Sequence, residues 1–193
     1  MNGHHLILGE LVDYISGEIV KDTHDERYRQ KIAQFLVEEK RYFKKEITPR
    51  FDLLIKADDN RAVIKVDFLI TLKNKICMLI KYSPGSLVTR HRPSLAASRL
   101  VSPYQIPLVV VTNGEDADIL DGRSGNVVGS GFEAIPTRSG LSQKTAQNQF
   151  DIITQKRADQ ESRIMYAFEV DGSCPCDDTI CKISDNEINR TDS

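Results

Sequence analysis

Two charged residues, Asp67 and Lys81, lie in neighbouring apolar segments that are separated only by the short polar link 73–75. β-branched and apolar residues on both sides of this link predict a hairpin with a three-residue loop. Symmetric pairing about the middle of the link places Leu72 opposite Ile76 and Asp67 opposite Lys81, with Cβ atoms roughly 4.5–5.5 Å apart. A charge within an apolar strand is unfavourable unless it is paired or functional. The pair is therefore either a plain cross-strand ion pair at a sheet edge or part of a functional site.

A helix is predicted directly upstream of this hairpin, over residues 23–40. Its apolar residues recur at helical spacing, and Thr23 and Glu26 have the spacing of a capping box. Glu26 has a second interpretation, because on the helical wheel it lies away from the main apolar face. It is therefore either a capping residue or a carboxylate available to a site beside the hairpin.

The remaining segments predict an α/β (α+β) fold with a central mixed sheet flanked by helices. Its sheet is expected within residues 46–112. Strand patterns occupy 46–57 and 106–112, a helix with Pro93 at its start is predicted over 89–101, a further hairpin surrounds 121–125, and one or two helices follow in 139–168.

A basic segment covers the same part of the chain. Between Arg61 and Arg99 there are eight basic residues and one acidic residue, a net charge of +7, whereas the chain from Asn113 onward has 15 acidic and 8 basic residues, a net charge of −7. Clustered Lys and Arg are typical of a polyanion site, because they replace the counterions of phosphates. The alternative is that these residues line solvated faces or pair with the acidic tail.

Residues 22–136 resemble the N-terminal nuclease domain of type I restriction enzyme R subunits, within the broader PD-(D/E)xK, restriction-endonuclease-like nucleases. The matching positions are Glu26 in THDERYRQ, Asp67 in KVDFLITL, Lys81 in MLIKYSPGS and the TNG end at 112–114. The resemblance implies a restriction-endonuclease-like domain over 1–138, followed by a C-terminal helical extension and acidic, Cys-containing tail over 139–193. It also implies Asp67, Lys81 and Glu26 as catalytic residues, with Asp67 and Glu26 holding Mg²⁺.

The sequence departs from this family pattern at two positions. The acid of the acidic-x-Lys triplet falls on Leu79, which cannot bind a metal, and a glutamine of the following helix falls near Ala96. Phosphodiester cleavage of this type needs Mg²⁺ held by two or more carboxylates and a lysine near the attacking water. The Mg²⁺ site is therefore expected to be weak or lost unless Glu26, or Asp52 on the preceding strand, supplies the missing ligand; the alternative for Asp52 is a solvated strand position.

Basic residues near the hairpin are candidate contacts to DNA phosphates whether or not catalysis survives. They are Arg90 and Arg92, which follow the Ser83-Pro84-Gly85-Ser86 loop, and Lys73 and Lys75 in the hairpin link. Contacts of this kind position a nucleic acid and do not read its sequence.

The C-terminal cysteines Cys174, Cys176 and Cys181 form a C-x-C-x4-C cluster. Some nucleases of the superfamily that the chain resembles hold an iron–sulfur cluster on such residues. The alternative is free thiols, since the spacing fits no standard metal site.

Composition limits the class of protein without selecting a function. The 193 residues are 40% hydrophobic and 28% charged, which is typical of a globular domain, and no apolar run approaches the roughly 20 residues that span a bilayer. No secretory signal is visible at the start, so a cytoplasmic protein without a membrane segment is expected. Three hypotheses remain. The first is a restriction-type nuclease, or a relic of one that only binds DNA, whose partners are DNA and either a second copy of the chain or other restriction-system subunits. The second is an inert interaction module, and the third is a metal-binding regulator.

Overall fold

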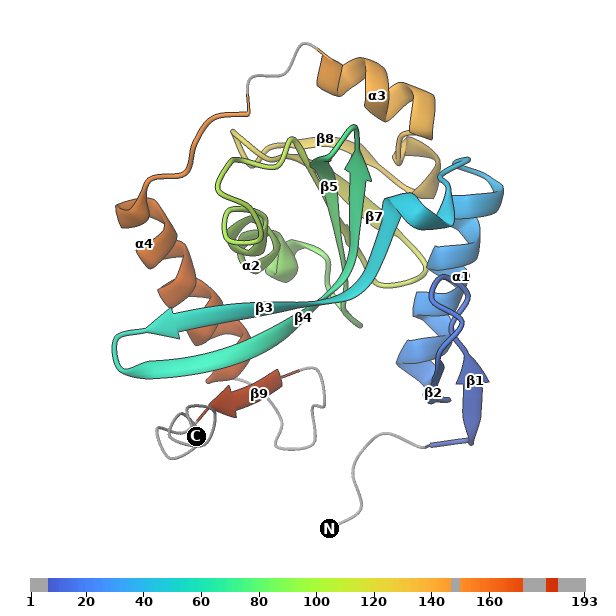
Figure 1. Ribbon diagram of the computed structural model, residues 1–193, viewed down its shortest axis with the longest axis horizontal. Helices are drawn as coiled ribbons and strands as arrows, with labels where there is room; N and C mark the ends of the chain where they lie inside the picture. The colour runs from blue at the N-terminus through green and yellow to red at the C-terminus, as the bar shows by residue number, and fades with distance from the viewer. Residues whose placement is uncertain (1–6, 147–149, 172–179, 184–193) are drawn as a thin grey trace.

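The computed structural model describes residues 7–146, 150–171 and 180–183, which fold around a mixed sheet (Figure 1). Within these ranges the main sheet has seven strands in the order β3-β4-β5-β6-β7-β8, and β9 pairs with β4. Only β5 and β6 run parallel, whereas the other neighbours are antiparallel. The strands are β3 Ile47–Ala57, β4 Asn60–Leu72, β5 Lys75–Tyr82, β6 Leu108–Thr112, β7 Ala117–Asp121, β8 Val127–Ser130 and β9 Ile180–Ile183. The α/β fold with a central mixed sheet is thus confirmed.

The β4–β5 hairpin forms where the sequence predicts it, but its turn is shorter. Lys73 and Asn74 both have positive φ, 49° and 62°, which is the signature of a two-residue type I′ turn. Lys75 already belongs to β5 and pairs with Leu72, so the predicted three-residue loop and the predicted Leu72–Ile76 pair are both wrong. A bulge between Ile70 and Thr71 shifts the strand register by one residue. Beyond this bulge the residues pair as predicted, as far as Phe68 and Ile80.

Strand β4 changes its partner halfway along one edge. Residues 68–72 of β4 pair with β5, residues 61–64 pair with β9, and β3 runs along the opposite edge. Between the two partners, at residues 65–67, β4 and β5 separate. We call this opening the β4–β5 split, and it contains Asp67 and lies beside Lys81.

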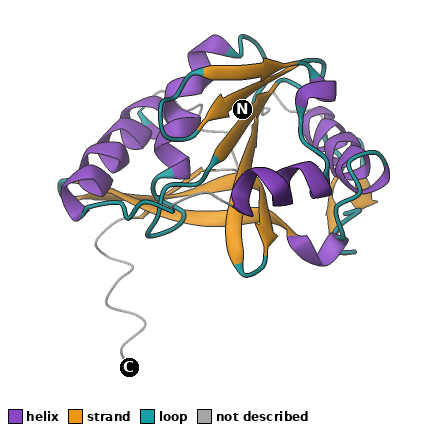
Figure 2. Ribbon diagram, turned by 90° about the horizontal axis from the view of Figure 1, so that it is seen from above, coloured by secondary structure: helices purple, strands orange, loops and turns teal. Residues whose placement is uncertain are grey.

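Helices cover both faces of the sheet (Figure 2). On one face, α1 (His24–Glu38) packs Ile32 and Leu36 against Ile70 and Ile80. On the other face, α2 (Val88–Ser98) packs against β6, and α4 (Gln155–Met165) packs against α2 and β3. The helix predicted over 23–40 is confirmed, whereas Pro93 lies inside α2 and not at its start.

Further elements lie at both ends of the described chain. A small hairpin of β1 (Glu10–Val12) and β2 (Ile19–Lys21) precedes α1. The helices expected in 139–168 are α3 (Arg138–Ala146) and α4, and α4 continues into the π-helix η3 (Tyr166–Val170). Short 3₁₀ turns occur at Lys44–Glu46, η1, and Phe132–Ala134, η2. None of the helices in the described ranges has the length and apolar character needed to cross a membrane.

Candidate functional site

Asp67 and Lys81 both lie at the β4–β5 split, but each contacts other partners. The Asp67 carboxylate accepts a hydrogen bond from the backbone N–H of Tyr82 at 2.8 Å and pairs with Arg29 Nε at 2.6 Å. The Lys81 ammonium donates to the carbonyl oxygen of Lys65 at 3.3 Å and pairs with Glu169 Oε2 at 3.2 Å. The two side chains therefore replace the strand pairing that is missing at the split, each bridging β4 to β5.

Glu26 lies both in the first turn of α1 and beside the hairpin, where its second interpretation places it. Thr23 caps α1, since its hydroxyl accepts the Glu26 N–H at 3.1 Å, which confirms this half of the capping box. The Glu26 carboxylate accepts a hydrogen bond from Gln30 at 2.7 Å, forms an ion pair with Arg50 and lies 3.7 Å from Arg29. Helix α1 thus places a carboxylate and an arginine, three residues apart on one face, beside the Asp67 end of the split.

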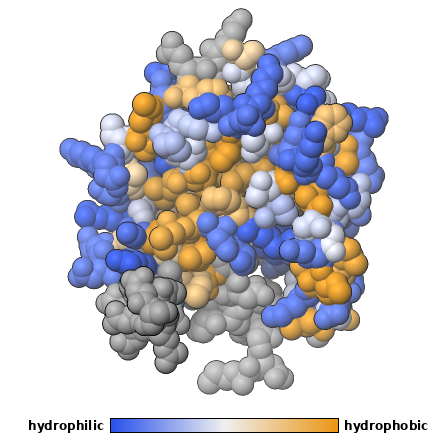
Figure 3. Space-filling model, in the orientation of Figure 1, coloured by the Kyte–Doolittle hydropathy of each residue, from blue (hydrophilic) through white to orange (hydrophobic). Residues whose placement is uncertain are grey.

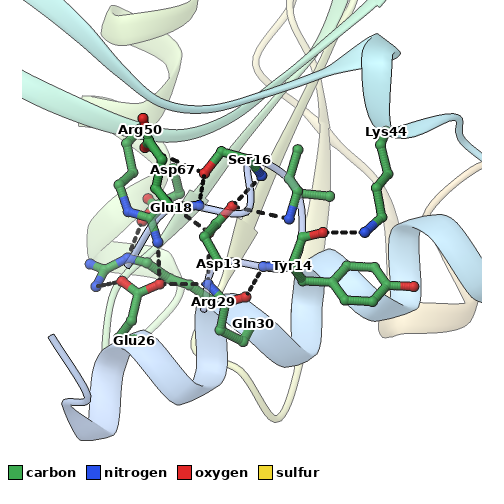
Figure 4. A network of polar contacts seen from close by, with 11 residues as sticks. Asp13, Tyr14, Ser16, Glu18, Glu26, Arg29, Gln30, Lys44, Arg50 and Asp67 are labelled. Carbon is green, nitrogen blue, oxygen red and sulfur yellow. Dashed lines mark hydrogen bonds and ion pairs between the residues drawn. The ribbon is translucent and has the colours of Figure 1, made fainter. Parts of the chain in front are cut away.

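A third carboxylate, Asp13, completes this group from the loop between β1 and β2 (Figure 4). It pairs with Arg50 at 2.7 Å and accepts hydrogen bonds from Gln30 and from the Ser16 amide. Burial alone raises the pKa of Asp13, but the hydrogen bonds from Ser16, Gln30 and Arg50 outweigh it and lower this pKa to about 2. Asp13 is therefore a permanent anion at neutral pH.

Arg50 reaches the carboxylates of Asp13 and Glu26 because the backbone of β3 is distorted at this residue. Its φ of 49° lies in the left-handed region, which a residue with a side chain rarely adopts. The residues on either side, Pro49 and Phe51, keep their regular partners Phe68 and Val66 on β4. The single distorted position opposite Asp67 thus turns the Arg50 side chain towards α1 and the β1–β2 hairpin.

Glu26, Arg29, Arg50 and Asp67 line a cleft of about 310 Å³ between the β1–β2 hairpin, the start of α1 and strands β3 and β4. We call it the arginine cleft. Its lining includes four cationic and two anionic side chains, and two further carboxylates, Asp13 and Asp52, pair with the lining residues Arg50 and Lys65. The lining residues are Ile19, Val20, Lys21, Thr23, Glu26, Arg29, Arg50, Lys65 and Asp67.

The donor set in the cleft does not fit a Mg²⁺ ion. Asp67 and Glu26 are both neutralised by arginines, and Leu79, where the family pattern requires an acid, is fully buried in the apolar core. Asp52 is 60% exposed on its side chain and pairs with Lys65, as expected of a solvated strand position. Within the described residues no group of three or more Asp, Glu, His or Cys is arranged to hold a metal.

The four predicted DNA contacts lie in two separate places. Lys73 and Lys75 are at the turn of the β4–β5 hairpin, where the Lys75 ammonium lies over the ring of Tyr104. Arg90 and Arg92 are in α2, beyond the opposite end of β5, a strand that spans roughly 23 Å. The structure does not bring these two pairs together.

Arg92 also belongs to a second ionic group, which we call the Glu161 cluster. Glu161 of α4 has no exposed surface and pairs with three arginines: Arg92 at 2.6 Å, Arg99 at 2.8 Å and Arg157 at 2.7 Å. Burial raises the pKa of Glu161, but the hydrogen bonds from Arg92 and Arg99 outweigh this and lower it. Part of the basic segment 61–99 thus pairs with the acidic part of the chain, as one of the two interpretations of its charge required.

Most of the residues that contact Asp67, Lys81 and Glu26 could not be identified from a sequence motif. Arg29 could be found from its helical spacing to Glu26, because residues three apart share a helix face. Asp13, Arg50 and Glu169 lie in segments without a motif, and only the folded chain brings them to the split. Of the C-terminal cysteines, Cys174 and Cys176 lie outside the described residues, and Cys181 is an exposed free thiol in β9.

The fold is an α/β domain in which the β4–β5 hairpin opens beside Asp67 and Lys81. Comparison with protein families matches residues 24–136, more than half of the chain, to the family described as Type I restriction enzyme R protein N terminus. The chain belongs to this family and is a restriction-type, nuclease-like domain. Neither the curated proteins nor the solved structures gave a match. The matched segment contains α1 and the hairpin with Asp67 and Lys81, whereas Asp13, Glu161 and Glu169 lie outside it.

Proposed function

We propose that this domain binds DNA in the arginine cleft without hydrolysing it. The observation that carries this proposal is that the two carboxylates expected to bind a metal form ion pairs with arginines. Asp67 pairs with Arg29, and Glu26 pairs with Arg50 and lies close to Arg29. We further propose that the domain has the PD-(D/E)xK fold and that Mg²⁺ binding has been lost or is weak.

Electrostatics supports binding in the cleft. Lys21, Arg29, Arg50 and Lys65 all line the cleft, so a phosphate that enters it meets several cationic donors. The start of α1 also lies at the cleft, and the positive end of a helix dipole favours phosphate. Backbone phosphates are the groups that Arg and Lys bind most often on DNA.

The same charges argue against hydrolysis. Mg²⁺ requires oxygen ligands that are free to coordinate it, and it gives up its own water reluctantly. A carboxylate already bound to a guanidinium has to break a charge-assisted hydrogen bond before it can serve as a ligand. With Leu79 in the core, the described chain offers no third acid on β5.

DNA binding is tested by fluorescence anisotropy of a labelled oligonucleotide at about 50 and about 200 mM salt. We expect affinity to fall steeply with salt, and the double variant Lys21→Ala/Lys65→Ala to weaken binding and lower the salt slope by about 2, one for each lost phosphate contact. Lys144→Ala on α3 removes one exposed lysine outside the cleft and is the control. Absence of binding at low salt contradicts the proposal.

The same assay locates any second contact surface. The variants Lys73→Ala/Lys75→Ala and Arg90→Ala address the two places predicted from the sequence. If substituting the hairpin lysines reduces DNA affinity as much as substituting the cleft lysines does, DNA lies across the hairpin turn. The cleft is then not the main site. Arg92 is unsuitable for this purpose, because its substitution also breaks the Glu161 cluster.

One observation favours hydrolysis as a second candidate. Glu169 Oε2 lies 3.2 Å from the Lys81 ammonium, so η3 supplies an acid beside the lysine that lacks one on its own strand. Plasmid cleavage with Mg²⁺ and then Mn²⁺, in the native protein and in Lys81→Ala, distinguishes the two. Nicking that Lys81→Ala abolishes overturns the non-hydrolysing proposal, and Glu169→Gln then tests the substitute acid. No nicking in either metal supports binding alone.

Family membership also indicates the partners. We propose that DNA and other subunits of a restriction system, or a second copy of this chain, associate with the domain in the cytoplasm. Size-exclusion chromatography with light scattering, with and without DNA, measures the number of copies per complex.

A further inference from the structure

The guanidinium groups of the arginine cleft are recessed from the molecular surface. The side chains of Arg29 and Arg50 are only 16% and 23% exposed, and the cleft of about 310 Å³ matches the lower range of small-ligand pockets. The phosphates of a DNA duplex lie on the outside of a stiff rod, which cannot enter a hollow of this size. A strand end or an unpaired nucleotide can enter it.

The charge state of the cleft favours one kind of phosphate. Arg50 is shared between Asp13 and Glu26, and Arg29 is shared between Asp67 and Glu26. An incoming anion has to compete with these carboxylates for the guanidinium groups. A backbone phosphodiester carries one negative charge, whereas a terminal phosphomonoester carries about 1.5 to 2 and can accept paired hydrogen bonds from the arginine fork.

Apolar side chains stand at the rim of the same cleft. Ile19 and Val20 of β2 line it, and Ile19 is 69% exposed. Figure 3 shows the apolar surface of the β1–β2 hairpin at the lower right, next to hydrophilic side chains. Across the hairpin, Val12 pairs with Ile19 and is exposed as well. An apolar rim beside a cationic floor suits a nucleotide, whose base has an apolar face and whose phosphate is charged.

The β1–β2 hairpin is fixed against α1 and β3 by named contacts. Asp13 pairs with Arg50, and the Tyr14 N–H donates to the side-chain oxygen of Gln30 at 2.7 Å. Its residues 10–21 precede the family-matched segment, which begins at residue 24. The rim therefore lies outside the family-matched segment.

We propose that the arginine cleft binds the phosphorylated end of a single DNA strand. The terminal phosphate binds Arg50 and Arg29, Lys21 and Lys65 each neutralise one of the following backbone phosphates, and the first base contacts Ile19 and Val20. This inference rests on the proposed function, since it names the form of DNA that the same cleft accepts.

The test compares four probes in one binding assay. They are a single strand of about 12 nucleotides with a 5′-phosphate, the same strand with a 3′-phosphate, the strand with hydroxyl ends, and a blunt duplex with hydroxyl ends. The label is placed on the end without a phosphate, or within the strand for the hydroxyl probe. We expect one phosphorylated strand to bind about tenfold tighter than the hydroxyl strand, and the duplex to bind most weakly.

Variants of the cleft show whether the preference arises there. Arg29→Lys keeps the charge and loses the paired hydrogen bonds, so we expect it to remove most of the preference for the phosphate end. Ile19→Asp is expected to weaken binding of all single strands. Lys144→Ala is the control on α3, and circular dichroism verifies that each variant is folded.

The outcomes separate this inference from the proposed function. If all four probes bind equally and the cleft lysines still matter, the domain binds DNA through the cleft and the strand-end inference is wrong. Tighter binding of the duplex also overturns the inference alone. If no probe binds at about 50 mM salt, both the inference and the proposed function fail.

Discussion

The arginine cleft and the Glu161 cluster contain the same chemical groups in two different settings. In the Glu161 cluster, one carboxylate without exposed surface holds three arginines between α2 and α4. In the cleft, three carboxylates hold two arginines, and both guanidinium groups keep some contact with solvent. The first arrangement is built on one carboxylate without exposed surface, whereas in the second several carboxylates share two arginines that line a cleft.

This difference separates a structural role from a binding role. Breaking a buried ion pair leaves a charge without compensation, so such a group contributes to stability only when complete. The pairs of the cleft border a cavity instead, so an anionic ligand that enters it can take the place of one carboxylate on an arginine. We therefore expect substitutions in the Glu161 cluster to affect mainly folding, and substitutions in the cleft to affect mainly binding.

The largest effect is expected for Glu161→Ala. It leaves the buried Arg99 and the partly exposed Arg92 without their carboxylate, which we expect to lower the free energy of unfolding by about 3–5 kcal/mol. Urea unfolding followed by circular dichroism measures it, and the melting temperature should fall by about 10 °C. A loss below about 1 kcal/mol would show that the cluster resembles an exposed pair and would remove the contrast with the cleft.

A smaller, pH-dependent effect is expected for Asp13→Asn in the cleft. The folded pKa of Asp13, about 2, lies below its ordinary value of 3.8, so the stabilisation is complete above about pH 5 and is lost as the pH falls towards 2. We expect the variant to be about 1–2 kcal/mol less stable at pH 7, because it loses the charge that pairs with Arg50. Urea titrations from pH 7 to pH 2.5 should show the native and variant proteins converging. A constant difference would mean that the Asp13 charge does not contribute.

The smallest effect is expected for Asp52→Ala. Asp52 pairs with Lys65 at 2.8 Å, but its side chain is 60% exposed, so we expect a change below about 0.5 kcal/mol. DNA affinity should stay equal or rise slightly, since Lys65 loses a competing carboxylate. Measuring stability and binding on the same preparation sharpens the comparison: a large loss of stability would place Asp52 with the buried ionic group.

Local patterns predict much of this fold, and they fail where distant segments meet. Helix α1, strands β3 to β6 and the β4–β5 hairpin follow from apolar spacing and turn residues, which act over a few positions. Strand β9 lies in a polar, acidic part of the chain and is ordered by β4, more than 100 residues away. Its four residues have no periodicity long enough to indicate a strand.

The candidate site shows the same limit. Counting along the hairpin correctly brings Asp67 and Lys81 to one end of the β4–β5 pairing. Their partners could not be deduced, because Arg29 comes from α1 and Glu169 from η3, and no spacing rule connects these segments to the hairpin. The same holds for Arg50, whose side chain reaches the cleft through one unusual backbone angle.

The change of partner along β4 has a consequence for synthesis of the chain. Strands β3, β4 and β5 are contiguous and can pair as soon as they leave the ribosome, whereas residues 61–64 of β4 have to wait for residues 180–183. Until then this edge of β4 presents unpaired amide and carbonyl groups and can pair with another chain. The nascent domain is thus most prone to misassembly beside the position where its mature form places Lys81.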